Sequence, residues 1–124
     1  MERVYKPLPE LGREEINRIL QSGTIEELII LPLSLGEYCS NWRESQDICV
    51  QLANHEDERV RANAGLGLAY TARTKHKLEK HIVKPVLLKL LDDCMEYRWR
   101  IIDSIQDINM FMSWHIGEKV IKRG

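Results

Sequence analysis

The chain has 124 residues, a length that suits one domain, and its 44% hydrophobic and 30% charged residues are typical of an ordinary globular protein. No apolar run approaches the roughly 20 residues of a membrane span, and the amino-terminal residues lack the apolar stretch of a secretory signal, so we expect a cytoplasmic protein. The three cysteines have no CxxC spacing and predict reduced thiols rather than a structural zinc site.

The charges are divided along the chain, although the net charge is only −1. Residues 1–58 carry 12 acidic and 5 basic side chains, whereas residues 59–124 carry 7 acidic and 13 basic ones. A bipolar charge distribution steers charged partners and raises association rates. It argues against nucleic-acid binding by the first half and leaves such binding open for the second half.

The first part of the chain predicts two short helices. Residues 1–12 contain two prolines and a glycine and are expected to be an irregular lead-in, followed by a helix over about 13–21. Thr24, with Glu27 three residues later, has the spacing of a capping box and predicts the start of a second helix. Pro32 lies inside this segment, so we expect either a bent helix or two short turns.

The middle of the chain predicts two longer helices, over about 42–54 and 58–74. Gly65 and Gly67 lie inside the second of these helices, where each glycine costs about 1 kcal/mol relative to alanine. We expect a neighbouring helix to approach closely at these glycines, because a larger side chain would block that approach.

The last part of the chain predicts helices over about 78–92 and 95–114, followed by a basic tail over 115–124. Pro85 either occupies the first turn of a shorter helix or kinks a longer one. No hairpin signal for strands is present. Apolar residues near the end of the last predicted helix either cap the molecule or form a dimer face: Phe111, Met112 and Trp114.

A weak internal repeat with a 39-residue step relates two of the helix pairs. Segment 43–54 aligns with 82–93, and segment 60–72 aligns with 99–111, with apolar residues at matching positions. A step of about 40 residues made of two helices is typical of a stacked array of helical hairpins. We therefore predict an all-α fold, a short right-handed superhelix of about three hairpins over 13–38, 42–74 and 78–114. Such arrays usually serve as binding scaffolds.

Residues 52–69 resemble a HEAT repeat. The acidic turn at Asp57 is followed by the pair Val60-Arg61 and then by Ala64, the order in which that family opens the second helix of its hairpin. The resemblance implies a HEAT/ARM-like fold, in which the second helices line the concave face. It also implies that Arg61 bonds to the acidic turn or to the neighbouring repeat.

The following repeat departs from this pattern. Trp99-Arg100 stands where the family has valine and arginine, and Asp103 stands where it has alanine. Residues 13–38 would be a degenerate hairpin without the motif. The fold supports many roles, so these residues indicate architecture more than activity.

A single chain of about three such hairpins is also similar to small bacterial immunity proteins, including those of contact-dependent growth-inhibition systems. These proteins neutralise a toxin encoded at the same locus. The resemblance implies a non-catalytic protein that binds and blocks a cognate toxin. The acidic residues favour a toxin with a basic, nuclease-like surface.

Five residues are predicted to contact the partner: Asn63, Trp99, Arg100, Asp103 and Asp107. Asp103 and Asp107 lie one turn apart on the same helix face, where they either form a solvated or salt-bridged surface or accept a cationic side chain. Trp99 lies between two arginines and is the predicted anchor, because tryptophan and arginine are enriched in interface hot spots.

No catalytic motif is present, and we expect neither a cofactor nor a metal ion. Two alternatives remain open at this point. The basic segment 73–89 would suit a nucleic-acid-binding protein, for which binding should depend on salt. The chain could also be an accessory subunit of a larger complex, and its oligomeric state is left open.

Overall fold

A computed structural model describes residues 7–123, which form helices and no strand. The all-α class predicted from the sequence is confirmed, and the first six helices lie within a few residues of their predicted bounds. The helices are α1 (Arg13–Ser22), α2 (Ile25–Tyr38), α3 (Trp42–Leu52), α4 (Glu58–Lys75), α5 (Lys80–Asp93), α6 (Arg98–Met112) and α7 (Glu118–Arg123).

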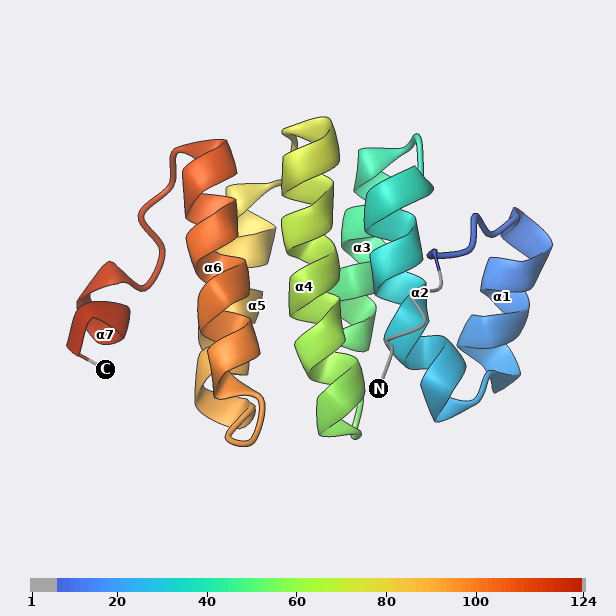
Figure 1. The fold of residues 1–124 in the computed structure, drawn as a ribbon, viewed down its shortest axis with the longest axis horizontal. Helices are drawn as coiled ribbons and strands as arrows, with labels where there is room; N and C mark the ends of the chain where they lie inside the picture. The colour runs from blue at the N-terminus through green and yellow to red at the C-terminus, as the bar shows by residue number, and fades with distance from the viewer. Residues whose placement is uncertain (1–6, 124) are drawn as a thin grey trace, which may run out of the picture.

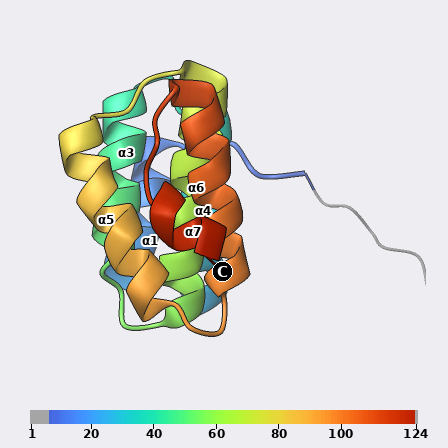
Figure 2. The ribbon, with the colours of Figure 1, turned by 90° about the vertical axis from the view of Figure 1, so that its left-hand side faces the viewer.

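The first six helices pair into three hairpins that follow one another along the long axis of the molecule (Figure 1). The helices α2, α4 and α6 lie side by side and form what we call the second-helix layer, with α3 and α5 behind it (Figure 1). The side view separates the two layers (Figure 2). This stacking is consistent with a short superhelix.

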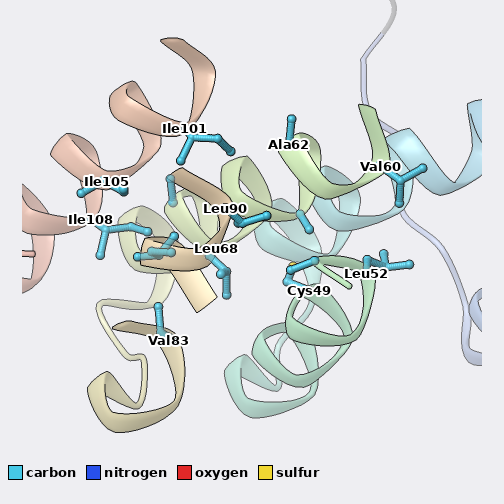
Figure 3. Packing of buried hydrophobic residues seen from close by; sticks show 14 of the residues in the cluster. Cys49, Leu52, Val60, Ala62, Leu68, Val83, Leu90, Ile101, Ile105 and Ile108 are labelled. Atoms are coloured by element: carbon cyan, nitrogen blue, oxygen red, sulfur yellow. The ribbon is translucent and has the colours of Figure 1, made fainter. Parts of the chain in front are cut away.

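The core fills the space between the two layers. Figure 3 shows side chains of α3, α4, α5 and α6 meeting there, among them the buried Cys49, Leu68, Leu90 and Ile105. Each large aliphatic side chain buried in this way stabilises the fold by roughly 1.5–3 kcal/mol. All three cysteines are free, and burial raises the pKa of the Cys49 thiol to about 12, so this thiol packs as a small neutral side chain.

Glycines allow α2 and α4 to touch backbone to backbone, as predicted for Gly67. A Cβ atom on Gly67 would lie 2.6 Å from the carbonyl oxygen of Pro32, and one on Gly36 would lie 2.7 Å from the carbonyl oxygen of Gly67. Near Gly65 there is no such backbone contact. A Cβ atom there would lie 3.3 Å from the terminal methyl groups of Ile101 and Leu90. The closest approach therefore occurs at Gly67 and not at Gly65.

Both internal prolines lie within continuous helices. Helix α2 runs through Pro32 and changes direction near its middle (Figure 1), so the expectation of a bent helix is confirmed and that of two short turns is wrong. Helix α5 begins at Lys80, which places Pro85 in its second turn rather than its first. The first-turn alternative for Pro85 is therefore wrong.

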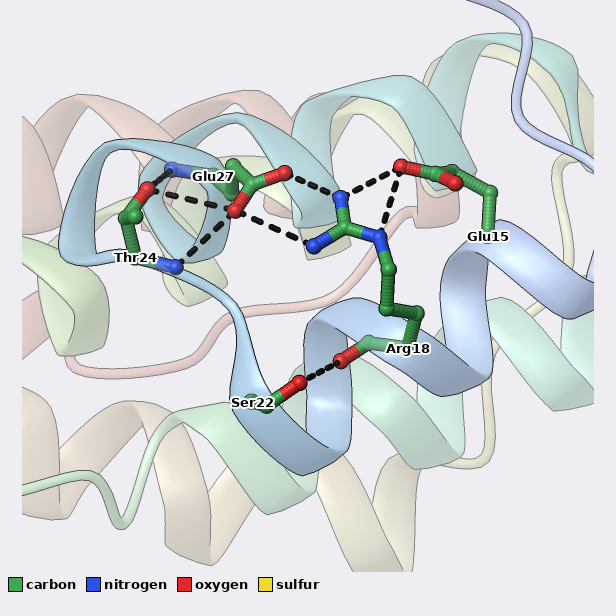
Figure 4. Close-up of polar contacts among 5 residues, drawn as sticks. All are labelled: Glu15, Arg18, Ser22, Thr24 and Glu27. Carbon is green, nitrogen blue, oxygen red and sulfur yellow. Dashed lines mark hydrogen bonds and ion pairs between the residues drawn. The ribbon is translucent and has the colours of Figure 1, made fainter.

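The predicted capping box at the start of α2 is present and extends to α1 (Figure 4). The Thr24 hydroxyl accepts from the Glu27 backbone N–H at 3.2 Å, and the Glu27 carboxylate accepts from the Thr24 backbone N–H at 3.0 Å. Arg18 of α1 donates to both Glu15 and Glu27. The Arg18 hydrogen bond, followed by that from Thr24, lowers the pKa of Glu27 to about 2.

Helix α7 lies in the segment that was predicted to be a tail, and it covers α5 and α6 at the end of the stack (Figure 2). The connection is anchored by Asn109, whose side chain accepts from the Ile116 backbone N–H at 2.9 Å and donates to the Ile116 carbonyl at 3.0 Å. Phe111, Met112 and Trp114 are partly buried and pack against the core, which agrees with a cap contact and leaves the dimer face untested. None of the described helices is long and apolar enough to cross a bilayer.

Candidate protein-binding site

Asn63 ties the three helices of the second-helix layer together. Its amide nitrogen donates to the Ile29 carbonyl of α2 at 2.9 Å, and its amide oxygen accepts from the Arg100 guanidinium of α6 at 2.7 Å. Only 4% of Asn63 is exposed. Asn63 was predicted to contact the partner, but it is buried beneath Arg100 and holds that side chain in place.

The amino-terminal end of α6 is fixed to α4 by a second set of contacts. The Glu58 carboxylate of α4 accepts from the backbone N–H groups of Glu96 and Tyr97, at 2.8 and 3.0 Å. The Arg100 guanidinium lies 5.4 Å from the centre of the Tyr97 ring. Because Arg100 is held by both Asn63 and Tyr97, its side chain would lose little conformational entropy on binding another molecule.

Trp99 forms a ridge between two hollows, and 74% of it is exposed. The hollow towards α4, which we call the α4–α6 hollow, has a volume of about 420 Å³. The hollow towards α7, the α6–α7 hollow, has a volume of about 300 Å³. Trp99 and Asp103 line both of them. The α4–α6 hollow is completed by Leu66, Glu96, Tyr97 and Arg100, and the α6–α7 hollow by Arg98, Ile102, Gln106, Val120 and Ile121.

Asp103 and Asp107 are exposed on α6 and have no ion pair or hydrogen bond within the part of the chain that the structure describes. Arg100, which precedes Asp103 by one turn, turns instead to Asn63. The salt-bridged alternative for these carboxylates is therefore wrong within the described residues, and acceptance of a cationic side chain from a partner stays a prediction. Asp107 lies one turn beyond Asp103 and outside both hollows.

The structure thus brings four of the five predicted contact residues together, and it adds others that the sequence did not single out. Ile102, Gln106, Val120 and Ile121 complete the α6–α7 hollow. The apolar pair Val120-Ile121 was the one available signal, because it follows a glycine at an otherwise polar end of the chain. The role of Glu58 could not be read from the sequence, since its partners are backbone groups of the next hairpin.

Arg61 takes the structural role that the HEAT resemblance implies. Its guanidinium donates to the carbonyl groups of His55 and Glu56, both at 2.9 Å, and so closes the turn between α3 and α4. Asp57 caps α4 by accepting from the Arg59 backbone N–H at 2.8 Å. These two residues stabilise the hairpin.

The basic segment 73–89 does not form one uniform surface. Arg73 pairs with Glu37 at 2.5 Å, the Lys80 ammonium lies 5.8 Å from the centre of the Trp114 ring, and Lys89 donates to Asn54 at 3.3 Å. Lys75, Lys77 and Lys84 have no such contact in the described structure. Several of the cations are therefore already engaged within the molecule.

The surface has a further hollow, at the amino-terminal end of the stack. This hollow of about 290 Å³ lies between α1, the end of α2 and the start of α3, where Arg13 and Glu44 pair at 2.9 Å. Within residues 7–123, no group of three or more histidine, cysteine, aspartate or glutamate side chains is arranged to hold a metal ion.

Comparison with known proteins gives a likeness of fold. No family model matches the sequence, and no curated protein matches it. Among solved structures, the fold is similar to a chain in the crystal structure of the CDI complex from Cupriavidus taiwanensis LMG 19424, with a TM-score of 0.77 and 22% sequence identity. The match covers 89% of this chain and 98% of that chain. The two chains therefore share one fold over nearly their whole lengths.

Proposed function

We propose that this chain is a non-catalytic immunity protein that binds and blocks a cognate toxin in the cytoplasm. The observation that carries the proposal is the exposed Trp99 between two hollows, beside the unpaired carboxylate of Asp103. Tryptophan is enriched in interface hot spots, and an unpaired carboxylate beside it can pair with a cation of the partner.

The similarity to a chain of a CDI complex supports the same proposal. We take CDI to denote contact-dependent growth inhibition, the system to which the sequence resemblance points. The likeness extends over 98% of that chain, so its helical arrangement has a counterpart here almost throughout. We propose that the similar chain is the toxin-binding member of its complex and that the present chain acts in the same way.

The proposed mechanism has two steps. The acidic first half of the chain, together with Asp103 and Asp107, steers a basic toxin surface towards the second-helix layer. Trp99 then becomes buried against the toxin, and Arg100, already held by Asn63, donates to an acceptor on it. Inhibition requires only that the bound protein cover the active site or the nucleic-acid-binding face of the toxin.

The test is affinity for the product of the adjacent gene. The purified toxin should co-purify with the wild-type protein, and the double substitution Asp103→Ala/Asp107→Ala should weaken binding about tenfold or more, mainly at low salt. The matched control is Asp92→Ala/Asp93→Ala, which removes the same charge from exposed residues at the end of α5, outside both hollows and outside the acidic first half. If both double variants bind equally well, the proposed site is wrong.

The two alternatives from the sequence have separate tests. Nucleic-acid binding through residues 73–89 would give an affinity for duplex DNA or RNA that falls steeply with salt, and absence of binding at low salt would discard it. An accessory subunit would fail to remain monomeric or soluble on its own.

A further inference from the structure

The α6–α7 hollow combines an apolar wall with a single carboxylate that lacks a partner. Ile102, Val120 and Ile121 supply the apolar wall, and Trp99 supplies an aromatic side. Asp103 supplies the charge, and it has no ion pair or hydrogen bond among the described residues. The other charged group at the hollow, Arg98, donates to the Leu91 carbonyl near the end of α5, where the partial negative charge of a helix terminus stabilises it.

The α4–α6 hollow shares Trp99 and Asp103 but has a different lining. Glu96 and Arg100 add a carboxylate and a guanidinium, and Arg100 is held in place by the Asn63 oxygen at 2.7 Å. This hollow offers one aliphatic side chain, Leu66, where the α6–α7 hollow offers three. The aliphatic stem of a long basic side chain should therefore lie on the α7 side of Trp99.

We infer that the α6–α7 hollow receives one lysine or arginine side chain of the toxin, an assignment that rests on the function proposed above. Long basic side chains lay their aliphatic stems along apolar surface and keep the charged end near water. Here the stem would lie along Ile102 and Val120. The charged end would pair with Asp103 and contact the face of Trp99, which attracts cations. Helix α7 thereby becomes part of the binding site.

The first experiment fills the hollow or removes its charge. Val120 is 49% exposed, so Val120→Trp should occupy the hollow without entering the core, and Asp103→Asn should remove the charge while keeping the shape. Both variants should keep the thermal unfolding midpoint of the wild type and lose about tenfold or more in affinity for the toxin. The matched control, Met110→Trp, adds the same ring at an exposed position of α6 outside the hollow and should bind within about twofold of wild type.

The second experiment identifies the cation. Each lysine and arginine of the toxin is changed to alanine, and its effect on binding is measured against wild type and against Asp103→Asn. For one toxin variant, the loss of affinity seen with the wild-type protein should be absent with Asp103→Asn, because the two substitutions remove the same contact. If the losses of all toxin variants add to that of Asp103→Asn, or if Val120→Trp binds like wild type, the assignment of this hollow is wrong. If the wild-type protein itself does not bind the toxin, the proposed function fails instead.

Discussion

The hairpins α3–α4 and α5–α6 are related by the same 39-residue step, yet they differ at the start of their second helices. Ala62 and its counterpart Ile101 are both fully buried. In contrast, Val60 is fully buried, whereas its counterpart Trp99 is 74% exposed. The repeat thus preserves the core register and changes the residues that face outward.

The paired arginines differ in the same way. Arg61 donates to two carbonyl groups of its own turn, whereas Arg100 reaches back to Asn63 of the preceding hairpin. The α3–α4 turn is therefore closed from within, and the start of α6 is held by α4. Arg100 is thereby directed to the preceding hairpin, while Trp99, the residue before it, is exposed. The candidate binding surface thus coincides with the place where the repeat departs from its own pattern.

The largest expected effect tests the shared core register. Ile101→Ala should lower the free energy of unfolding by about 2–5 kcal/mol, because it leaves a cavity among packed helices. The measurement is urea unfolding followed by circular dichroism. Met110→Ala, at an exposed position of the same helix, is the control and should change stability by no more than about 0.5 kcal/mol. Equal effects of the two substitutions would contradict the assigned register.

The next prediction concerns the glycine contact that distinguishes α4 from α6. Gly67→Ala should destabilise the protein by about 1–3 kcal/mol, because its new methyl group would meet the backbone of Pro32. Gly65→Ala is the matched control, since the atoms near it are the ends of side chains that can move. It should cost clearly less in the same unfolding assay. A gain in stability for Gly67→Ala, as helix propensity alone predicts, would refute the close approach.

A smaller difference in stability is expected between alanine substitutions at Val60 and at its counterpart Trp99. Val60→Ala should cost about 1–2 kcal/mol of stability, since it removes buried methyl groups. Trp99→Ala should leave stability within about 0.5 kcal/mol of wild type, although it removes a much larger side chain. In the toxin-binding assay the order should reverse, with a loss for Trp99→Ala only. Binding unaffected by Trp99→Ala would remove the anchor from the proposed interface.

The smallest effect lies in the first hairpin and depends on pH. Glu27 has a pKa of about 2 in the folded protein, below its ordinary value of 4.5, so it stabilises the fold fully above about pH 4.5. This contribution should be lost as the pH falls from about 4.5 towards 2. Glu27→Gln should therefore show a shallower loss of stability over this range in urea unfolding at a series of pH values. An identical acid profile for the two proteins would mean that Arg18 does not hold the carboxylate in solution.

Much of the architecture could be predicted from the sequence because it depends on neighbours along the chain. The capping box of Thr24 and Glu27 and the ends of the first six helices follow from local hydrogen bonding and from apolar spacing. Helix α7 could not be predicted in this way, because six residues form a stable helix only when other helices cover them. The connection that leads to it is held by hydrogen bonds between Asn109 and Ile116.

The candidate site was less accessible to prediction. The sequence singled out Trp99 and Asp103 through their departure from the repeat, and the structure places both at the two hollows. It placed Asn63 among the contact residues, whereas the fold uses both ends of that side chain internally. Whether these residues bind a partner stays a prediction.

The sequence by itself determined the first six helices, their order and the small residue that allows close packing at Gly67, because periodicity, capping and glycine act locally. Only the tertiary structure decided that Arg100 pairs with Asn63 rather than with Asp103, and that Trp99 points outward where Val60 is buried. The physical reason is that these outcomes depend on which helix lies alongside, and groups that are distant in sequence then compete for the same hydrogen bonds and the same buried space.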